Sequence, residues 1–197
     1  MKKLIFLMLL AISFSTVSAQ RNYSQNWYQI GLRVSTQIPL VREYSDVDYL
    51  STLRTPHVGV YFRAGKYVYG EVGIGYQYFR SRFDVTQPDG TEVSDMIQTH
   101  YLVLPFKAVG EVPITKKIAF LPYVGVLYQP LLKVSYNILG YDKTNIENQW
   151  ALLTAGFDFR LGFITLGVDY RYSFQHYFLN KEGKKPQYIG ITMGVIF

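Results

Sequence analysis

Alternation of apolar and polar residues is the feature that most limits how this chain can fold. In FITLGVDYRYSF, residues 163–174, every second residue from Ile164 to Phe174 is aliphatic or aromatic, and those between are small, polar or charged. Successive side chains of a strand point to opposite faces, so this stretch predicts a β-strand with one apolar and one polar face.

The same period-two pattern recurs along the chain and predicts eight strands. We expect them at residues 27–37, 55–64, 67–80, 97–109, 118–136, 150–160, 163–174 and 188–197. Connections 65–66, 110–117 and 161–162 are short, whereas 38–54, 81–96, 137–149 and 175–187 are long and polar. Strands of about ten residues joined by alternately short and long connections predict an all-β fold, an eight-stranded antiparallel up-and-down transmembrane β-barrel.

The positions of the charged residues indicate which face lies inside the barrel. Charges share the polar face with glycines, whereas the other face is aliphatic and aromatic. In water that second face would be a very large exposed apolar patch, but lipid requires it. We therefore predict a lumen charge network of Arg33, Arg63, Glu71, Lys107, Asp158, Arg160, Asp169 and Arg171. A secreted ligand-carrying barrel would have the opposite arrangement, and its Gly-x-Trp signature is absent because Gln25 stands two residues before Trp27.

Eight strands enclose a bore only wide enough for side chains. The five basic residues of the predicted network face three acidic ones, and buried cations need carboxylate partners. We expect salt bridges to fill the lumen. The basic excess leaves a narrow, anion-preferring leak as the alternative.

The first 19 residues have the pattern of a cleaved secretory signal peptide. Lys2 and Lys3 precede an apolar run over residues 4–11, and Val17-Ser18-Ala19 ends the segment. We therefore expect a signal peptide at 1–19 and an outer-membrane β-barrel domain at 20–197. Without Lys2 and Lys3 the chain has 18 basic and 14 acidic residues, a net charge of +4 that does not indicate a nucleic-acid partner.

The end of the chain resembles the assembly signal that the barrel-insertion machinery reads in outer-membrane barrels. The matching residues are Ile189, Ile191, Met193, Val195 and Phe197. Aromatic residues at the strand ends predict two interfacial girdles, with Trp27 and Phe197 at one rim and Tyr78, Tyr128, Tyr172, Phe174 and Tyr177 at the other.

A second resemblance lies in HYLVLPFKAVGEVPITKKIAFLPYVGV, residues 100–126. Its Leu104-Pro105 pair and the later Pro122-Tyr123-x-Gly125 start are similar to the small outer membrane protein beta-barrel domain family, a porin-like family of OmpA/OmpX-type eight-stranded barrels. The resemblance implies a scaffold in the outer membrane of a Gram-negative cell envelope, without known catalytic residues.

The three histidines are the obvious candidates for catalysis. Some eight-stranded outer-membrane barrels are lipid A enzymes, and the deacylase type has His and Ser two residues apart on one strand face. Here Gly59, Leu102 and Phe178 stand two residues after His57, His100 and His176, so the pattern is missing. We expect interfacial histidines and no enzyme. The chain has no Cys, and we expect no cofactor or metal site.

The connections at the outer end carry the remaining functional predictions. In NKEGKK, residues 180–185, Lys181, Lys184 and Lys185 are candidates for contact with lipopolysaccharide phosphates, with a solvated loop tip as the alternative. We expect a monomer among outer-membrane lipids that presents four extracellular loops in a structural or surface-interaction role to an unidentified envelope or extracellular protein. A small porin-like channel and an accessory barrel of a protein secretion system are the alternatives.

Overall fold

The computed structural model describes residues 27–40, 49–86, 90–135, 137, 140, 142–177 and 185–197. No helix within these ranges has the length and hydropathy needed to cross a membrane. The described residues form ten β-strands: β1 Tyr28–Pro39, β2 Tyr49–Arg54, β3 His57–Lys66, β4 Val68–Thr86, β5 Glu92–Gly110, β6 Val112–Pro113, β7 Ile118–Val134, β8 Gln149–Leu161, β9 Ile164–Ser173 and β10 Gln187–Ile196.

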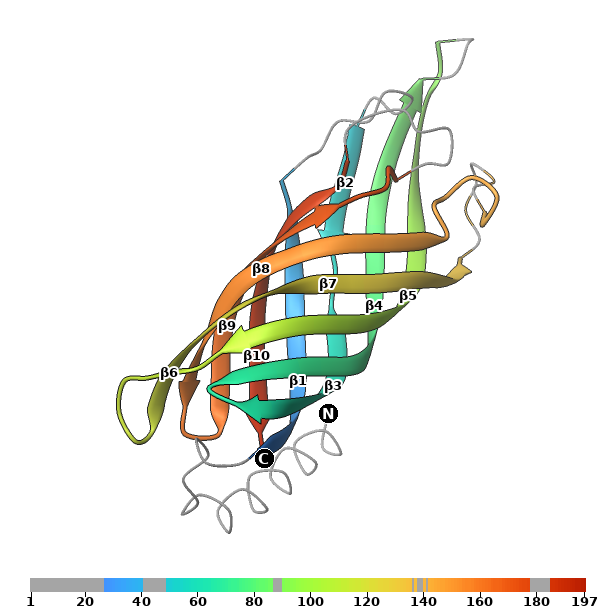
Figure 1. The fold of residues 1–197 in the computed structure, drawn as a ribbon. Helices are drawn as coiled ribbons and strands as arrows, with labels where there is room; N and C mark the ends of the chain where they lie inside the picture. Colours follow the sequence, from blue (N-terminus) through green and yellow to red (C-terminus); the bar gives the residue numbers. More distant parts are fainter. Residues whose placement is uncertain are drawn as a thin grey trace, which may run out of the picture.

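The ten strands occupy eight strand positions around a closed antiparallel barrel (Figure 1). We call each of these positions a wall. β2 and β3 both pair with β4 and form one wall, and β5 and β6 both pair with β7 and form another. β10 returns to pair with β1, in a register that runs from Gly31 opposite Ile196 to Pro39 opposite Tyr188. The predicted fold class is therefore confirmed.

The break between β2 and β3 has a local cause. Pro56 has no backbone N–H to donate to a ladder, and a side chain replaces the backbone ladder next to it. The Thr55 hydroxyl donates to the Gln37 carbonyl (2.7 Å) and accepts from the Gln37 N–H (2.6 Å). Thr55 therefore keeps β1 joined to this wall where regular pairing stops.

The two ends of the barrel differ as predicted, but the strands are longer at one end. The turns after β3, β6 and β8 lie at the lower end of Figure 1, which we call the short-turn end; the other is the long-loop end. β4 and β5 run into the connection predicted at 81–96 and pair as far as Thr86 and Glu92, and β2 lies inside the connection predicted at 38–54. Those two connections are shorter than predicted because backbone pairing continues past the apolar alternation.

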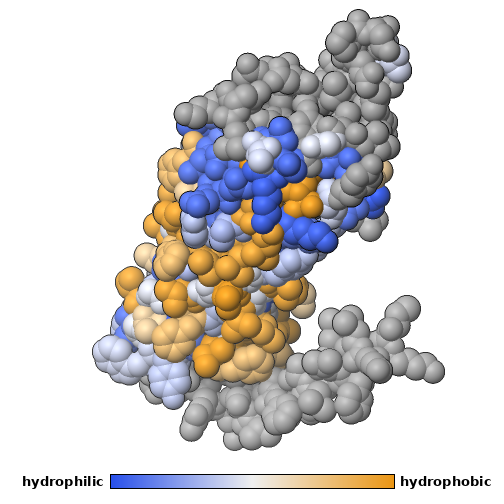
Figure 2. Space-filling view, turned by 90° about the vertical axis from the view of Figure 1, so that its right-hand side faces the viewer, coloured by the Kyte–Doolittle hydropathy of each residue, from blue (hydrophilic) through white to orange (hydrophobic). Residues whose placement is uncertain are grey.

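Buried and exposed residues alternate along most of each wall, so each strand has one side toward the bore and one side on the exterior. The outward positions are apolar and exposed, as at Ile74, Phe106 and Val168. Figure 2 shows one side of the barrel, where hydrophobic residues form a broad band beneath a hydrophilic region. This is the surface of a barrel that spans a lipid bilayer.

Candidate functional site

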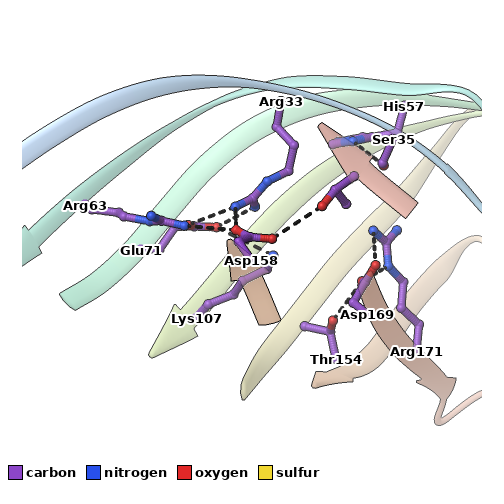
Figure 3. A network of polar contacts seen from close by, with 11 residues as sticks. Arg33, Ser35, His57, Arg63, Glu71, Lys107, Thr154, Asp158, Asp169 and Arg171 are labelled. Atoms are coloured by element: carbon purple, nitrogen blue, oxygen red, sulfur yellow. Dashed lines mark hydrogen bonds and ion pairs between the residues drawn. The ribbon is translucent and has the colours of Figure 1, made fainter. Parts of the chain in front are cut away.

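The bore holds nine buried charged residues among the described part of the chain, five cations and four carboxylates. Glu71 of β4 and Asp158 of β8 are the acceptors of its central group (Figure 3). The Arg33 guanidinium donates to Glu71 (Nη1–Oε1, 2.8 Å) and to Asp158 (Nη2–Oδ2, 3.1 Å). Because β1 and β8 are not neighbours, Arg33 links separate walls across the bore.

Arg63 of β3 and Lys107 of β5 complete this central group. Arg63 donates to Glu71 (Nε–Oε2, 2.7 Å) and to Asp158 (Nη2–Oδ2, 3.4 Å), and the Lys107 ammonium lies 3.6 Å from Glu71 Oε1. Three cations thus share two carboxylates. Charge-assisted bonds of this kind offset the cost of burying each ion.

Two tyrosine rings interact with the three cations of the central group, which outnumber its two carboxylates. The Tyr61 ring contacts two guanidinium groups, with its centroid 4.5 Å from Cζ of Arg33 and 4.9 Å from Cζ of Arg63. The Lys107 ammonium lies 4.2 Å from the centroid of Tyr123. The negatively polarised faces of the rings attract the cations. The rings also occupy space in the bore.

A second ion pair joins Asp169 and Arg171, both on β9. The Arg171 guanidinium contacts the Asp169 carboxylate, which also accepts from the Thr154 hydroxyl (3.1 Å). A Cβ added at Gly190 would stand 2.0 Å from Asp169 Oδ1, and one added at Gly167 would stand 2.0 Å from Asp158 Oδ1. The inward glycines therefore leave the space that the carboxylates occupy.

A third ion pair lies toward the short-turn end and contains a residue that sequence reasoning missed. Arg160 donates to Glu111 (Nη2–Oε1, 2.8 Å), and the Tyr69 hydroxyl donates to the other carboxylate oxygen (2.7 Å). Glu111 was predicted to lie in the connection at 110–117. Extending the inward alternation of Lys107 and Val109 by two residues would have found it.

A buried cluster rich in aromatic residues, which we call the aromatic plug, lies above the charges, and sequence reasoning missed it as a unit. Its buried members are Phe79, Ile97, Tyr101, Leu127, Leu131, Ile146, Trp150, Leu152, Tyr177 and Tyr188. Trp150 packs with ring centroids 5.7 Å from Phe79, 5.3 Å from Tyr101 and 5.5 Å from Tyr177. Tyr177 therefore belongs to this plug, and its predicted place in the outer girdle is wrong.

The three histidines lie in different surroundings. His57 faces the bore, with Nδ1 3.2 Å from the Ser35 hydroxyl (Figure 3), so an interfacial position is wrong for this residue. His100 faces outward and contacts the Tyr76 hydroxyl through Nδ1 and the Ser135 hydroxyl through Nε2 (3.4 Å). His176 is half-buried after β9. The Ser135 contact was missed because it joins His100 of β5 to the residue just after β7 rather than two residues of one strand.

The structure describes only some of the remaining predicted residues. Ile189, Ile191, Met193 and Val195 lie along the outward side of β10, and the backbone of Phe197 exchanges hydrogen bonds with Ile30 of β1. Lys185 is half-buried before β10, whereas Lys181 and Lys184, like the signal peptide predicted at 1–19, lie outside the described residues. The described residues contain no group of three or more His, Cys, Asp or Glu able to hold a metal ion.

Comparison with known proteins places the chain by fold. No protein-family model matches it, and no curated protein matches its sequence. Among solved structures, the outer membrane protein OprG from Pseudomonas aeruginosa is similar with a TM-score of 0.50 at 14% identity, over 86% of this chain and 95% of that one. The N-terminal β-barrel domain of Pseudomonas aeruginosa OprF (TM-score 0.41, 12% identity, 86% and 97% covered) and Ail from Yersinia pestis (TM-score 0.38, 13% identity, 86% and 99% covered) are more distant. The likeness to OprG and the closed barrel confirm the predicted resemblance at the level of fold: this chain is an eight-stranded antiparallel transmembrane barrel of the kind found in outer membranes.

Proposed function

We propose that the chain is an integral outer-membrane protein whose bore is filled and whose function lies in its exposed loops, in a structural or surface-interaction role. Three observations together carry the proposal. The central ion pairs join separate walls of the bore, the aromatic plug lies above them, and the exterior is apolar. A barrel built this way is stable in a bilayer without offering a wide aqueous path.

The proposal includes export, orientation and contacts. The signal peptide directs export of the chain, and the barrel then lies in the outer membrane as a monomer with its short turns toward the periplasm and its long loops toward the exterior. The alternating residues that end with Phe197 are read by the barrel-insertion machinery. Lys181, Lys184 and Lys185 contact lipopolysaccharide phosphates from the last long connection.

Conductance in planar lipid bilayers tests the filled bore. The folded protein is expected to give no steady single-channel steps, because bound side chains occupy the cross-section at the ion pairs and again at the plug. Steady steps that recur with each insertion would contradict the proposal.

A small channel is the second candidate, and one observation favours it. The five buried cations exceed the four buried carboxylates by one, so a narrow path along the bore would prefer anions. A reversal potential measured in a salt gradient distinguishes the two cases: an anion-selective current would establish the channel, and no current supports the filled bore.

We further propose that the barrel is not a hydrolase. The outward Ser135–His100 pair has the Tyr76 phenol at the nitrogen where a catalytic triad has a carboxylate. Labelled lipid A incubated with the folded protein is expected to release no more fatty acid than protein-free vesicles. Release that disappears in both the Ser135→Ala and His100→Ala variants would contradict the proposal and identify the pair as catalytic.

A further inference from the structure

The outward faces of β4 and β5 change from apolar to polar near the long-loop end. Ile74 of β4 and Phe106 of β5 are exposed in the apolar band. Nearer the long loops, Tyr78 pairs with His100 across the two strands, and Arg80 pairs with Gln98. Figure 2 shows the side that lies to the right in Figure 1, where hydrophilic residues gather directly above the hydrophobic band. A lipid molecule on this side would contact both surfaces at once.

A β-bulge adds a cation from β7 to this outward face. Gln129 and Leu131 are buried, so strict alternation would turn Lys133 into the bore beside the aromatic plug. The register instead moves from Tyr101 opposite Leu131 to His100 opposite Lys133, which makes Leu132 an extra residue. Lys133 is consequently exposed on the outside, next to His100. Bulges of this kind re-aim side chains, often beside functional sites.

Arg80 and Lys133 are two cations of this face, and neither has a carboxylate within ion-pair distance among the residues whose side chains the structure describes, which leaves out 49–54, 82–86 and 92–95. The Arg80 guanidinium contacts the Met96 sulfur, with Nη2 2.8 Å and Nε 3.2 Å from it. The bore contrasts with this, because each of its five cations has a carboxylate partner. At the border of the apolar band, where water is scarce, an unpaired cation gains most from an anion.

We propose that Arg80 and Lys133 bind the phosphate groups of a lipopolysaccharide molecule in the outer leaflet, while its acyl chains lie on the apolar band below. Arg80 supplies a planar donor pair for phosphate oxygens and Lys133 supplies a point charge. The exposed apolar surface at Ile74 and Phe106 favours a lipid over free phosphate, because it gives the acyl chains a place to lie. This site depends on the proposed orientation in the outer membrane and is separate from the lysines of the last loop.

Lipid A titrations measured by native mass spectrometry test the site. The full mature chain, folded in neutral detergent, is titrated with bisphosphorylated lipid A and with the same lipid after removal of both phosphates. The variant Arg80→Gln/Lys133→Gln is expected to bind the phosphorylated lipid roughly tenfold more weakly than wild type, because two charge-assisted contacts are lost. Both proteins are expected to bind the dephosphorylated lipid equally.

Two matched variants serve as controls. Lys116→Gln/Lys117→Gln makes the same charge change on the exposed β6–β7 turn at the short-turn end and is expected to bind like wild type. Arg80→Lys/Lys133→Arg keeps both charges and is also expected to bind the lipid. Equal affinity of wild type and Arg80→Gln/Lys133→Gln for phosphorylated lipid A, or an equal loss in the control at 116–117, would overturn the site. Neither outcome alters the conductance that tests the filled bore.

Discussion

At the scale of single residues, Glu71 is the acceptor on which the most cations converge. Arg33, Arg63 and Lys107 all lie within ion-pair distance of its carboxylate, which is almost completely buried. The sequence placed these four side chains on one side of alternating strands, but it could not pair them. Pairing depends on how far each strand is staggered against its neighbours, and the alternation does not record the stagger.

Replacing Glu71 by Gln is expected to destabilise the barrel by about 3–5 kcal/mol, because it leaves buried cations short of a counter-charge. The measurement is the free energy of unfolding in urea for the protein in lipid vesicles. Asp142→Asn is the matched control: Asp142 is exposed, and an amide oxygen in place of its Oδ1 can still accept from Thr144, so little change is expected. Equal unfolding midpoints for Glu71→Gln and wild type would show that the central ion pairs contribute nothing to stability.

At the scale of strands, the sequence predicted the walls but not all of their limits. Period-two alternation placed Leu166, Val168 and Tyr170 outside, and all three are exposed. The parts that were missed have other causes. β2 and the outer ends of β4 and β5 lie past the apolar alternation, and the Lys133 bulge breaks the alternation itself. Backbone pairing of β2, β4 and β5 continues past the apolar band, where contact with lipid no longer requires every second side chain to be apolar.

Thr55→Val is expected to weaken the junction between β1 and the β2–β3 wall. Valine has the same shape but removes both hydrogen bonds to Gln37, so a buried N–H and C=O lose their partner at a cost of about 1–3 kcal/mol. Thr36→Val provides the control, because Thr36 is exposed on the outward side of β1. Urea unfolding in vesicles checks both variants. A Thr55→Val protein as stable as Thr36→Val would mean that the hydroxyl does not join these strands.

At the scale of the whole molecule, the bore has three layers. The Arg160–Glu111 pair and a small cluster of Tyr69, Val109, Ala119, Leu121 and Tyr123 lie toward the short-turn end, the central ion pairs follow, and the aromatic plug lies above. The buried charged residues other than Glu111 could be foreseen from their positions in the alternation. The plug could not, because Phe79, Tyr101 and Trp150 come from different strands and meet only once the barrel closes. Large inward side chains near one end of several strands were the available signal.

The outward position of the apolar residues is the central property of this barrel, and spin-label accessibility tests it directly. The chain has no Cys, so single cysteines introduced at Val168 and Lys117 can each carry one nitroxide in lipid nanodiscs. Because Val168 is exposed in the apolar band, its label is expected to collide with oxygen far more than with a water-soluble nickel chelate, and the Lys117 label on the exposed turn is expected to show the reverse. Greater access of nickel than of oxygen at Val168 would contradict a barrel with its apolar side in lipid.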